Sequence, residues 1–403
     1  MASCGTSASS SDQREEKPGT DLSAGDGFSD ISDSELVTVQ DEAMRDACAV
    51  RPVEGTDLQL KRNCGGLGTS ENEFQRLSGE NSKHKQQQQS AETSQRKRKQ
   101  QEPPQTPMEK YKMKYLWVTN LCSQTWCEQQ MVYEFELPEF IEPEKSEAMN
   151  TGSSIHLARE LEVHDLVSVA TKSREDSWAV KFINVLSMIP VLQSGGRIRE
   201  FPVFGELDGV LLVGVIDELS YSPKGELELR ELKTRRSPTM PTSAQKRSNQ
   251  FQVSLYKLLF DSMVSGSLQP DTFIHHLHLN PEQALGPDVK EHASKMGLIA
   301  SNFKDMLELT CLNLTYSDLP MIDGLKIEYC YQENNSLLGC EVVCFKSELV
   351  LEQLTFHMAF WKGLRETQGV DIEEAWKCRK CTFSNICEWR TRDLDFAKGK
   401  RPK

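Results

Sequence analysis

The chain has 403 residues, with 47 Lys and Arg against 60 Asp and Glu, and a formal net charge of −13. This acidic balance excludes a uniformly basic coat for holding nucleic acid, although it allows a local basic cleft. Only 37% of the residues are hydrophobic and 7% aromatic, which indicates that part of the chain is disordered. The longest apolar stretch, residues 209–216, is far shorter than the roughly 20 residues that cross a bilayer, so we expect no membrane segment.

Residues 1–105 are predicted to form a disordered acidic and polar tail. They contain only two aromatic residues, Phe28 and Phe74, and cannot bury enough apolar surface to offset the entropy of ordering. The basic run at residues 96–99 fits a nuclear-import signal or a non-specific phosphate contact, and fits equally well a solvated run of charge. The Ser- and Asp-rich stretch around Phe28 is a candidate segment for recruiting a single-strand-binding or repair protein.

No apolar signal segment and no Arg-rich presequence opens the chain, so its twelve cysteines are expected as free thiols or metal ligands in a reducing compartment. We expect the nucleus, with the cytosol as a second compartment and the mitochondrion disfavoured. Residues 106–395 are predicted to form one compact domain in a monomer, followed by a short basic tail at residues 396–403.

The segment 209–236 is predicted to form two strands joined by a turn at residues 222–225, which include Pro and Gly. Successive side chains of a strand point to opposite faces of the sheet. The apolar row of the first strand therefore ends at Asp217, and that of the second strand ends at Glu231 and Lys233. Two acids and a lysine are expected to meet at the end of a buried face.

A buried carboxylate is costly unless it is paired or binds a cation. Two acids could hold Mg²⁺ or Mn²⁺, which polarise a phosphate and lower the pKa of bound water, and a lysine could orient that water or stabilise the developing charge. The alternative is a salt-bridged strand end, with Asp217 paired to Lys233 and Glu231 paired to Arg230 or Arg235.

Upstream of the hairpin, residues 152–160 are interpreted as a helix start, with Ser153 or Ser154 as the N-cap. His156 lies in the first turn of this predicted helix. His156 and Glu160 are four residues apart and share one face of the helix. A single histidine in such a place is usually a structural residue.

Downstream, a helix is predicted to begin at residue 249, with Gln252 and Tyr256 four residues apart on one face. Four basic residues between the hairpin and this helix form a collar suited to phosphates, or an ordinary solvated run of charge. They are Arg235, Arg236, Lys246 and Arg247.

Four motifs occur in order: G-x-x-x-H-x-x-x-E, G-x-x-D, E-x-K and Q-x-x-x-Y. This order resembles the PD-(D/E)XK nuclease superfamily, in the branch of the bacterial RecB nuclease domain, and is similar to the eukaryotic exonuclease V family over roughly residues 110–395. The resemblance implies an α/β restriction-endonuclease-like core, with a central mixed sheet flanked by helices. It also implies a Mg²⁺-dependent exonuclease that acts on single-stranded DNA in DNA repair. The alternative is an inactive iron–sulfur or zinc scaffold that binds DNA.

The resemblance implies that Asp217 and Glu231 bind the catalytic metal, with the carbonyl of Leu232 as a further ligand. It also implies that His156 reaches a metal, either the same one or a second one. It further implies that Lys233 acts on the nucleophilic water. Gln252 and Tyr256 would position Lys233 and the scissile phosphate, while Glu206 and Asp208 are alternative ligands. Trp117, Trp126, Phe201 and Phe204 are candidates for stacking on unpaired bases, although core packing is the more common role for any one of them. These residues indicate neither the polarity of digestion nor whether RNA is cut.

Near the carboxyl end, Cys378, Cys381 and Cys387 follow the pattern C-x₂-C-x₅-C and need a fourth ligand, for which Cys127 and Cys122 are the candidates. Four thiolates can hold zinc or a [4Fe–4S] cluster, and the spacing does not separate the two. The resemblance implies the iron–sulfur cluster, with Cys127 as the first choice for the fourth ligand. Such a centre would close the domain as a structural belt.

Overall fold

The structure is a computed structural model that describes residues 46–52, 105–140 and 143–391. Most of the tail predicted at residues 1–105, its basic run and the tail at residues 396–403 lie outside the described residues. Within the range of that predicted tail, the structure describes one segment, Asp46–Pro52, which forms strand β1. It pairs antiparallel with β3 (His164–Ala170), which supplies backbone hydrogen-bond partners that the sequence of the segment does not reveal.

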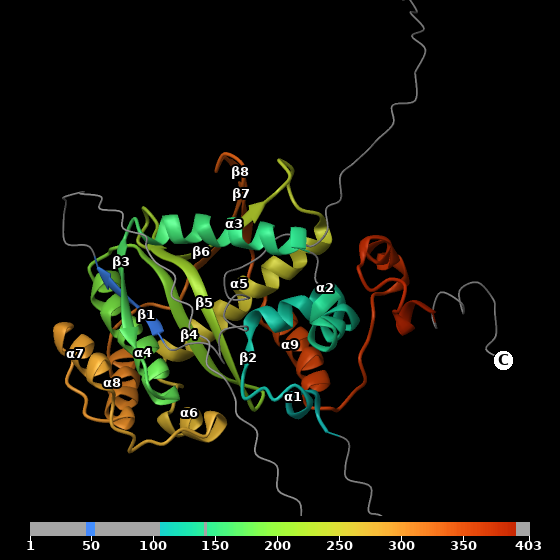
Figure 1. Cartoon of the computed structure of the whole chain (residues 1–403). Coiled ribbons are helices and arrows are strands. Elements are labelled where there is room, and N and C mark those ends of the chain that lie inside the picture. The colour runs from blue at the N-terminus through green and yellow to red at the C-terminus, as the bar shows by residue number, and fades with distance from the viewer. Residues whose placement is uncertain (1–45, 53–104, 141–142, 392–403) are drawn as a thin grey trace, which may run out of the picture.

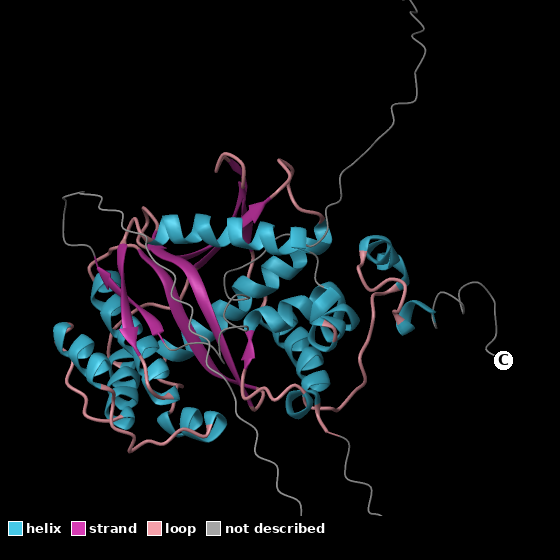
Figure 2. Ribbon diagram, in the orientation of Figure 1, coloured by secondary structure: helices cyan, strands magenta, loops and turns pink. Residues whose placement is uncertain are grey.

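A six-stranded mixed sheet forms the centre of the molecule (Figures 1 and 2). Its strands are β2 (Leu116–Trp117), β4 (Ile198–Leu207), β5 (Val210–Tyr221), β6 (Leu227–Arg235), β7 (Gly324–Tyr331) and β8 (Leu337–Val343). The order is β2-β5-β6-β7-β8, and β4 also pairs with β5. The β2–β5 and β6–β7 pairs are parallel and the other pairs are antiparallel. The prediction of an α/β protein with a mixed central sheet is confirmed.

Two hairpins set the register of β4, β5 and β6. The predicted turn between β5 and β6 is confirmed, with Gly225 at a φ of 81°. The turn between β4 and β5 consists of Asp208 and Gly209, with φ of 52° and 73°. Positive φ at both central residues of a two-residue loop matches the twist of the flanking strands.

Helices cover both faces of the sheet. On one face, Ile155 of α3 packs with Leu232 and Cys330 in a small cluster. On the other face, Tyr256 of α5 lies against Gly214 of β5. Figure 1 shows α3 crossing the central strands, with α4, α6, α7 and α8 gathered at one end and α2 and α9 at the other.

The described helices and 3₁₀ segments are α1 (Pro107–Lys110), α2 (Val118–Glu136), η2 (Pro138–Phe140), α3 (Pro143–Glu160), α4 (Arg174–Gln193), α5 (Ser243–Val264), α6 (Pro270–Leu277), α7 (Pro287–Lys295), α8 (Phe303–Thr315), α9 (Ser347–Trp361) and η3 (Ile372–Lys380). None of the helices in this part of the chain combines the length and the hydropathy that a membrane span requires.

Two helix starts differ from the prediction. Helix α3 begins at Pro143, so Ser153 and Ser154 lie inside it, and their hydroxyls donate to carbonyls four residues earlier at 3.1 and 2.9 Å. A mid-helix serine can make this bond instead of capping the helix. Helix α5 begins at Ser243 rather than at residue 249, because Thr242 and Gln245 form a capping box.

The carboxyl-terminal segment is tied to α2. The guanidinium of Arg365 donates to both oxygens of the buried Glu128, at 2.7 and 2.5 Å. The backbone N–H of Gln129 donates to the carbonyl of Gln368 at 3.0 Å. Directly before Glu128, Cys127 interrupts the helical geometry of α2 with extended backbone angles of φ −166° and ψ 108°. The Arg365–Glu128 and Gln129–Gln368 contacts therefore hold the cysteine-rich carboxyl-terminal segment beside residue 127.

Candidate active site

Asp217 and Glu231 lie at the fork where β5 and β6 separate. The ladder between these strands pairs Glu218 with Arg230 and stops there, so the next pair in register is Asp217 and Glu231. Beyond this last backbone pair, the Asp217 side chain links the two strands. Its Oδ2 accepts a hydrogen bond from the backbone N–H of Leu232 at 2.6 Å. The hairpin register thus brings together the two acids that the sequence predicts.

On the other side of β5, Glu200 of β4 also faces this position. Arg199 pairs with Glu218 and Phe201 pairs with Ile216, which places Glu200 opposite Asp217. Glu200 has a φ of 53°, in the left-handed region that residues other than glycine rarely adopt. The left-handed conformation takes Glu200 out of the ladder at the fork.

His156 reaches the same fork from α3. Its Nδ1 lies 3.6 Å from Oδ1 of Asp217 and 3.9 Å from Oε1 of Glu200. The three residues are the one set of three His, Cys, Asp or Glu side chains within the described part of the chain whose ligand atoms all lie within 4.8 Å of one another. Imidazole and carboxylate groups at this spacing can share a divalent cation.

Lys233 is held by residues on both of its sides. Its Nζ lies 3.1 Å from Oε1 of Glu231 and donates to Oε1 of Gln252 at 2.7 Å. The amide nitrogen of Gln252 in turn donates to the hydroxyl of Tyr256 at 2.9 Å. All four side chains are buried, so this chain of contacts fixes the ammonium beside the acids. The i, i+4 placement of Gln252 and Tyr256 is as predicted.

The ion pairs at this strand end differ in part from those of the salt-bridged alternative. Lys233 forms an ion pair with Glu231. Arg230 forms its ion pairs with three other glutamates, at Glu218, Glu228 and Glu328. The guanidinium of Arg235 donates to the carbonyl of Thr239. Glu231 therefore has no arginine partner among the described residues.

Burial dominates the electrostatics of Glu231. Desolvation, followed by the negative charge of Asp217, raises the pKa of this carboxyl to about 8, although Lys233 and His156 oppose the rise. Oε2 of Glu231 has no hydrogen-bond partner among the described residues, and the side chain is fully buried. A buried carboxylate oxygen without a donor is costly, and a cation would provide the missing partner.

The raised pKa of Glu231 predicts how the stability of the metal-free protein depends on pH. The folded chain binds a proton at Glu231 up to about pH 8, whereas the unfolded chain releases it near the ordinary pKa of 4.5. The contribution of Glu231 to the free energy of unfolding is therefore fully present below pH 4.5. It should fall as pH rises from there toward 8, by at most about 1.4 kcal/mol per pH unit. Urea unfolding in EDTA should show this slope, and Glu231→Gln should flatten it. An equal slope in the variant would contradict the assignment.

The two motif glycines permit close approaches between helix and strand. A Cβ at Gly152 of α3 would lie 2.9 Å from Oγ1 of Thr234, and a Cβ at Gly214 of β5 would lie 2.5 Å from Cε1 of Tyr256. Both distances are shorter than side-chain contacts allow. The glycines of G-x-x-x-H and G-x-x-D thus let α3 and α5 bring His156 and Tyr256 to the fork.

We expect Gly214→Ala to destabilise the protein by about 1–3 kcal/mol, because overpacking moves neighbouring side chains. Displacement of Tyr256 would also disturb the Gln252–Lys233 hydrogen bond, so the rate of any hydrolysis at this site should fall. Gly205→Ala is the matched control, since its Cβ would lie 3.3 Å from Leu259. Thermal unfolding and a rate measurement check the prediction, and equal losses in the two variants would contradict it.

The predicted basic collar is only partly on the surface. Arg235 is 1% exposed and its guanidinium binds a loop carbonyl, so it cannot contact phosphate as predicted. Lys246 is half-buried and lies 3.2 Å from Glu341, and Arg247 is ion-paired with Glu374. Arg236 is exposed. The exposed part of the collar consists of Arg236 and Arg247.

Two other sets of candidates are misplaced. The alternative ligands Glu206 and Asp208 lie away from the fork, where Glu206 is 3.1 Å from His276 and Asp208 is 2.8 Å from Lys362. The four aromatic residues proposed for base stacking are all buried in the core, so they do not offer a face to DNA; they are Trp117, Trp126, Phe201 and Phe204. Large aromatic residues in strands and buried helices pack more often than they bind.

The four predicted cysteine ligands line one pocket, together with Tyr133, Phe383 and other residues. They are Cys127, Cys378, Cys381 and Cys387. Burial, with a smaller contribution from the three neighbouring thiols, raises the pKa of Cys127 to about 12. Cys122 instead belongs to the hydrophobic core. The kink at Cys127 therefore brings this residue, and not Cys122, to the carboxyl-terminal cysteines.

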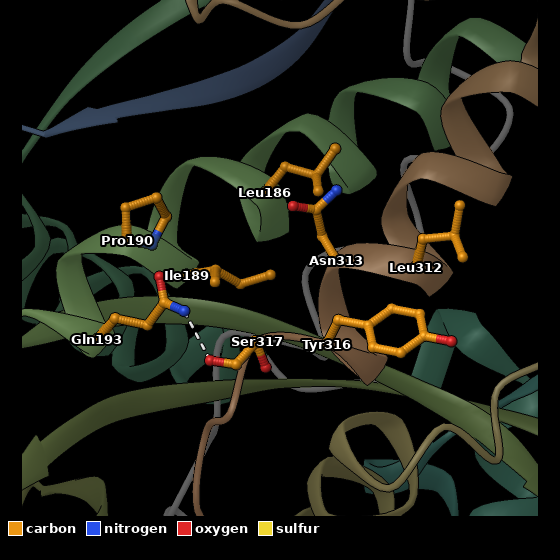
Figure 3. Close-up of a pocket in the computed structure, with 8 residues that line it drawn as sticks. All are labelled: Leu186, Ile189, Pro190, Gln193, Leu312, Asn313, Tyr316 and Ser317. Atoms are coloured by element: carbon orange, nitrogen blue, oxygen red, sulfur yellow. Dashed lines mark hydrogen bonds between the residues drawn. The ribbon is translucent and has the colours of Figure 1, made fainter.

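A separate cavity of about 330 Å³ lies between α4 and α8 (Figure 3). Its lining includes Leu186, Ile189 and Tyr316, and the amide nitrogen of Gln193 donates to the carbonyl of Ser317 at 2.6 Å. None of its lining residues is a predicted site residue, and none carries a charge. This cavity does not contribute to the chemistry at the fork.

The fold and the site define an α/β protein whose sheet carries two buried acids, a lysine and a histidine at a fork between strands. A family described as "Exonuclease V - a 5' deoxyribonuclease" matches residues 104–231, 222–309 and 292–390. Exonuclease V of Danio rerio is 41% identical over 366 residues, which are 91% of this chain and 93% of that relative. A solved structure titled "Crystal structure of SSO0001" covers 70% of this chain and 92% of its own, with 13% identity and a TM-score of 0.33.

The chain belongs to the exonuclease V family. It is therefore a DNA exonuclease, that is, a hydrolase, and the family description adds the 5′ designation that the residues alone did not indicate. The predicted family and the predicted class of enzyme are confirmed. Membership in a family of nucleases also removes the inactive scaffold as an alternative.

Proposed function

We propose that this exonuclease digests single-stranded DNA in a reaction that requires Mg²⁺ or Mn²⁺. The observation that carries the proposal is Glu231, whose fully buried carboxylate has an oxygen without a hydrogen-bond partner among the described residues, beside Asp217 and Lys233. Oxygen-rich sites of this kind suit hard divalent cations. Asp217, Glu231 and His156 would hold the ion, with the carbonyl of Leu232 as a further ligand.

When bound, the cation would supply Lewis acidity toward the phosphate and a lowered pKa for a water. The residues of the chain would provide position and charge. Lys233, fixed by Gln252, would orient the water or stabilise the negative charge that develops on the phosphate. Tyr256 holds Gln252 through the 2.9 Å hydrogen bond and so acts as a positioning residue. These proposed roles are the ones that the resemblance to PD-(D/E)XK nucleases implies.

Single-strand preference and a role in DNA repair rest on the family resemblance. The exposed part of the collar, Arg236 and Arg247, supports contacts to the phosphate backbone. The basic run at residues 96–99 and the predicted tail favour the nucleus and recruitment of a repair protein, although both lie outside the described residues. We further propose that the enzyme acts as a monomer.

We infer that the cysteine pocket holds a [4Fe–4S] cluster. The support for the proposal is that Cys127, Cys378, Cys381 and Cys387 line one pocket. Four thiolates can hold zinc or a cluster, and the family resemblance favours the cluster. Iron and sulfide analysis of the purified protein tests this inference.

Substrate preference is tested with linear single-stranded, circular single-stranded and duplex DNA of the same sequence, at equal enzyme concentration and in Mg²⁺. The proposal expects rapid loss of the linear single strand and no cutting of the circle. Label at the 5′ end should appear in short products from the first time points. Equal digestion of the duplex would refute the single-strand preference, and cutting of the circle would refute exonucleolytic action.

A further inference from the structure

We propose that Lys377 is a positioning residue of the cysteine pocket, which fixes the break in α2 at Cys127 and so places the fourth thiol. The inference deepens the proposed function, because it rests on a metal centre in this pocket. Lys377 directly precedes Cys378 in the sequence, and it lines the pocket together with the four cysteines. The chemistry proposed at the fork does not involve this lysine.

Lys377 is a buried cation. Its side chain is 3% exposed, and its Nζ lies 2.5 Å from Oε2 of Glu374. Glu374 belongs to the same 3₁₀ segment, η3, and also forms an ion pair with Arg247 of α5. A buried ammonium is costly unless it is paired and its remaining protons are hydrogen-bonded. The ion pair satisfies one part of this requirement, and α2 provides the further partners.

The partners of Lys377 on α2 lie at the break in that helix. In an unbroken helix, the carbonyl of Trp126 accepts the N–H of the residue four positions later, which is Gln130. At the break, the N–H of Gln130 hydrogen-bonds to the Cys127 thiol. The carbonyl of Trp126 accepts a hydrogen bond from Nζ of Lys377 at 2.9 Å. Lys377 thus supplies a donor to the backbone at the break, where a buried carbonyl without one would be costly.

The ring of Trp126 makes a second contact with the same ammonium. Nζ of Lys377 lies 4.5 Å from the centre of this ring, which is within the range of a cation–π interaction. Trp126 is buried and meets the ring of Trp376 edge-on, with the ring centroids 5.8 Å apart. Lys377 therefore holds the residue directly before Cys127 by its carbonyl and by its ring.

Cys127 depends on such support more than the other three cysteines do. Those three lie within residues 378–387, whereas Cys127 comes from a helix more than two hundred residues earlier in the sequence. Contacts of Glu128 and Gln129 with the carboxyl-terminal segment hold α2 directly after the break. Lys377 holds it directly before the break, at Trp126. Cys127 is therefore anchored on both sides, and loss of one anchor should displace its thiol from the pocket.

The first test measures how fast a chelator removes metal from the anaerobically purified, full-length protein. Lys377→Met removes the ammonium and keeps most of the side-chain volume, and Lys380→Met is the matched control, because Lys380 is exposed on the same segment. Replacing a residue that orients a metal ligand typically weakens metal binding about 10–100-fold. Lys377→Met should therefore lose its iron or zinc at least about 10-fold faster than the control. Equal rates in the two variants would overturn the inference.

Alkylation of individual thiols, followed by mass spectrometry on the protein as purified, separates a displaced Cys127 from misfolding. In Lys377→Met, Cys127 should react before Cys381 and Cys387, while Cys311 in the hydrophobic core stays protected. If the pocket thiols of this variant all react at the same rate, Lys377 does not act through Cys127 and the inference is overturned.

Glu374→Gln is a milder variant, which decides the question if Lys377→Met also exposes Cys311. It removes the charge that pairs with Lys377, and Glu373→Gln is its control, because Glu373 is the exposed neighbouring acid. Glu374→Gln should lose metal faster than this control and react sooner at Cys127, and equal values would overturn the inference. A metal-free wild type that digests DNA would refute the proposed centre but not the nuclease. If Cys127 in that wild type were as reactive as in Lys377→Met, the inference would fail as well.

Discussion

Lys233→Met should lower the rate of single-stranded DNA hydrolysis by about 10³-fold while leaving DNA affinity within about twofold of wild type. The substitution removes the ammonium but keeps most of the side-chain volume, so the buried site should remain packed. Loss of one group that stabilises transition-state charge or transfers a proton costs about 10²–10⁴-fold. Binding depends instead on the phosphate contacts outside the fork.

A matched control for this prediction is Lys326→Met. Lys326 lies on β7, the strand next to β6, and its Nζ is 2.7 Å from Glu228 rather than from the acids at the fork. Single-turnover rates and DNA affinity should therefore stay close to wild type. Activity of Lys233→Met within about tenfold of the control would contradict the role of this lysine.

Cys378→Ser is expected to release iron and destabilise the domain by about 5 kcal/mol, which corresponds to a fall of roughly 10 °C in the unfolding temperature. A cluster that joins residue 127 to residue 387 closes a loop of about 260 residues, and the entropy of closing so long a loop is large. Oxygen-free purification, iron analysis and calorimetry measure both effects.

Cys340→Ser controls for the loss of a thiol, because Cys340 is exposed and does not line the cysteine pocket. It should retain iron and unfold at the temperature of the wild type. Retention of full iron content in Cys378→Ser would contradict the four-cysteine assignment. Zinc in place of iron in the wild type would contradict the iron–sulfur cluster. It would still agree with a metal centre that joins Cys127 to the three carboxyl-terminal cysteines.

The sequence predicts those residues of the fork whose positions follow from the repeat of a strand or of a helix. Alternation along the β5–β6 hairpin placed Asp217, Glu231 and Lys233 together, and the helical repeat placed Gln252 beside Tyr256. Glu200 was missed, although its signal was present: a two-residue turn at residues 208–209 puts residue 200 opposite residue 217. Counting register back through that turn would have found it.

Other features depend on tertiary contacts that the sequence does not show. The pairing of β1 with β3 comes from two segments more than a hundred residues apart. Arg235 is buried because its guanidinium binds the carbonyl of Thr239 in a loop. From the sequence alone, a run of basic residues predicts solvent-exposed side chains. The start of α3 at Pro143 was obscured because serine serves both as an N-cap and as a mid-helix residue.

The most direct test of the account follows end-labelled linear single-stranded DNA with anaerobically purified full-length protein, with Mg²⁺ or with EDTA, beside Asp217→Ala. Asp217 accepts the Leu232 N–H and faces both Glu200 and Glu231, so its loss should remove cation binding at the fork. The account predicts shortening of the DNA by the wild type in Mg²⁺ and in no other lane. Equal shortening in EDTA, or by Asp217→Ala, would contradict it.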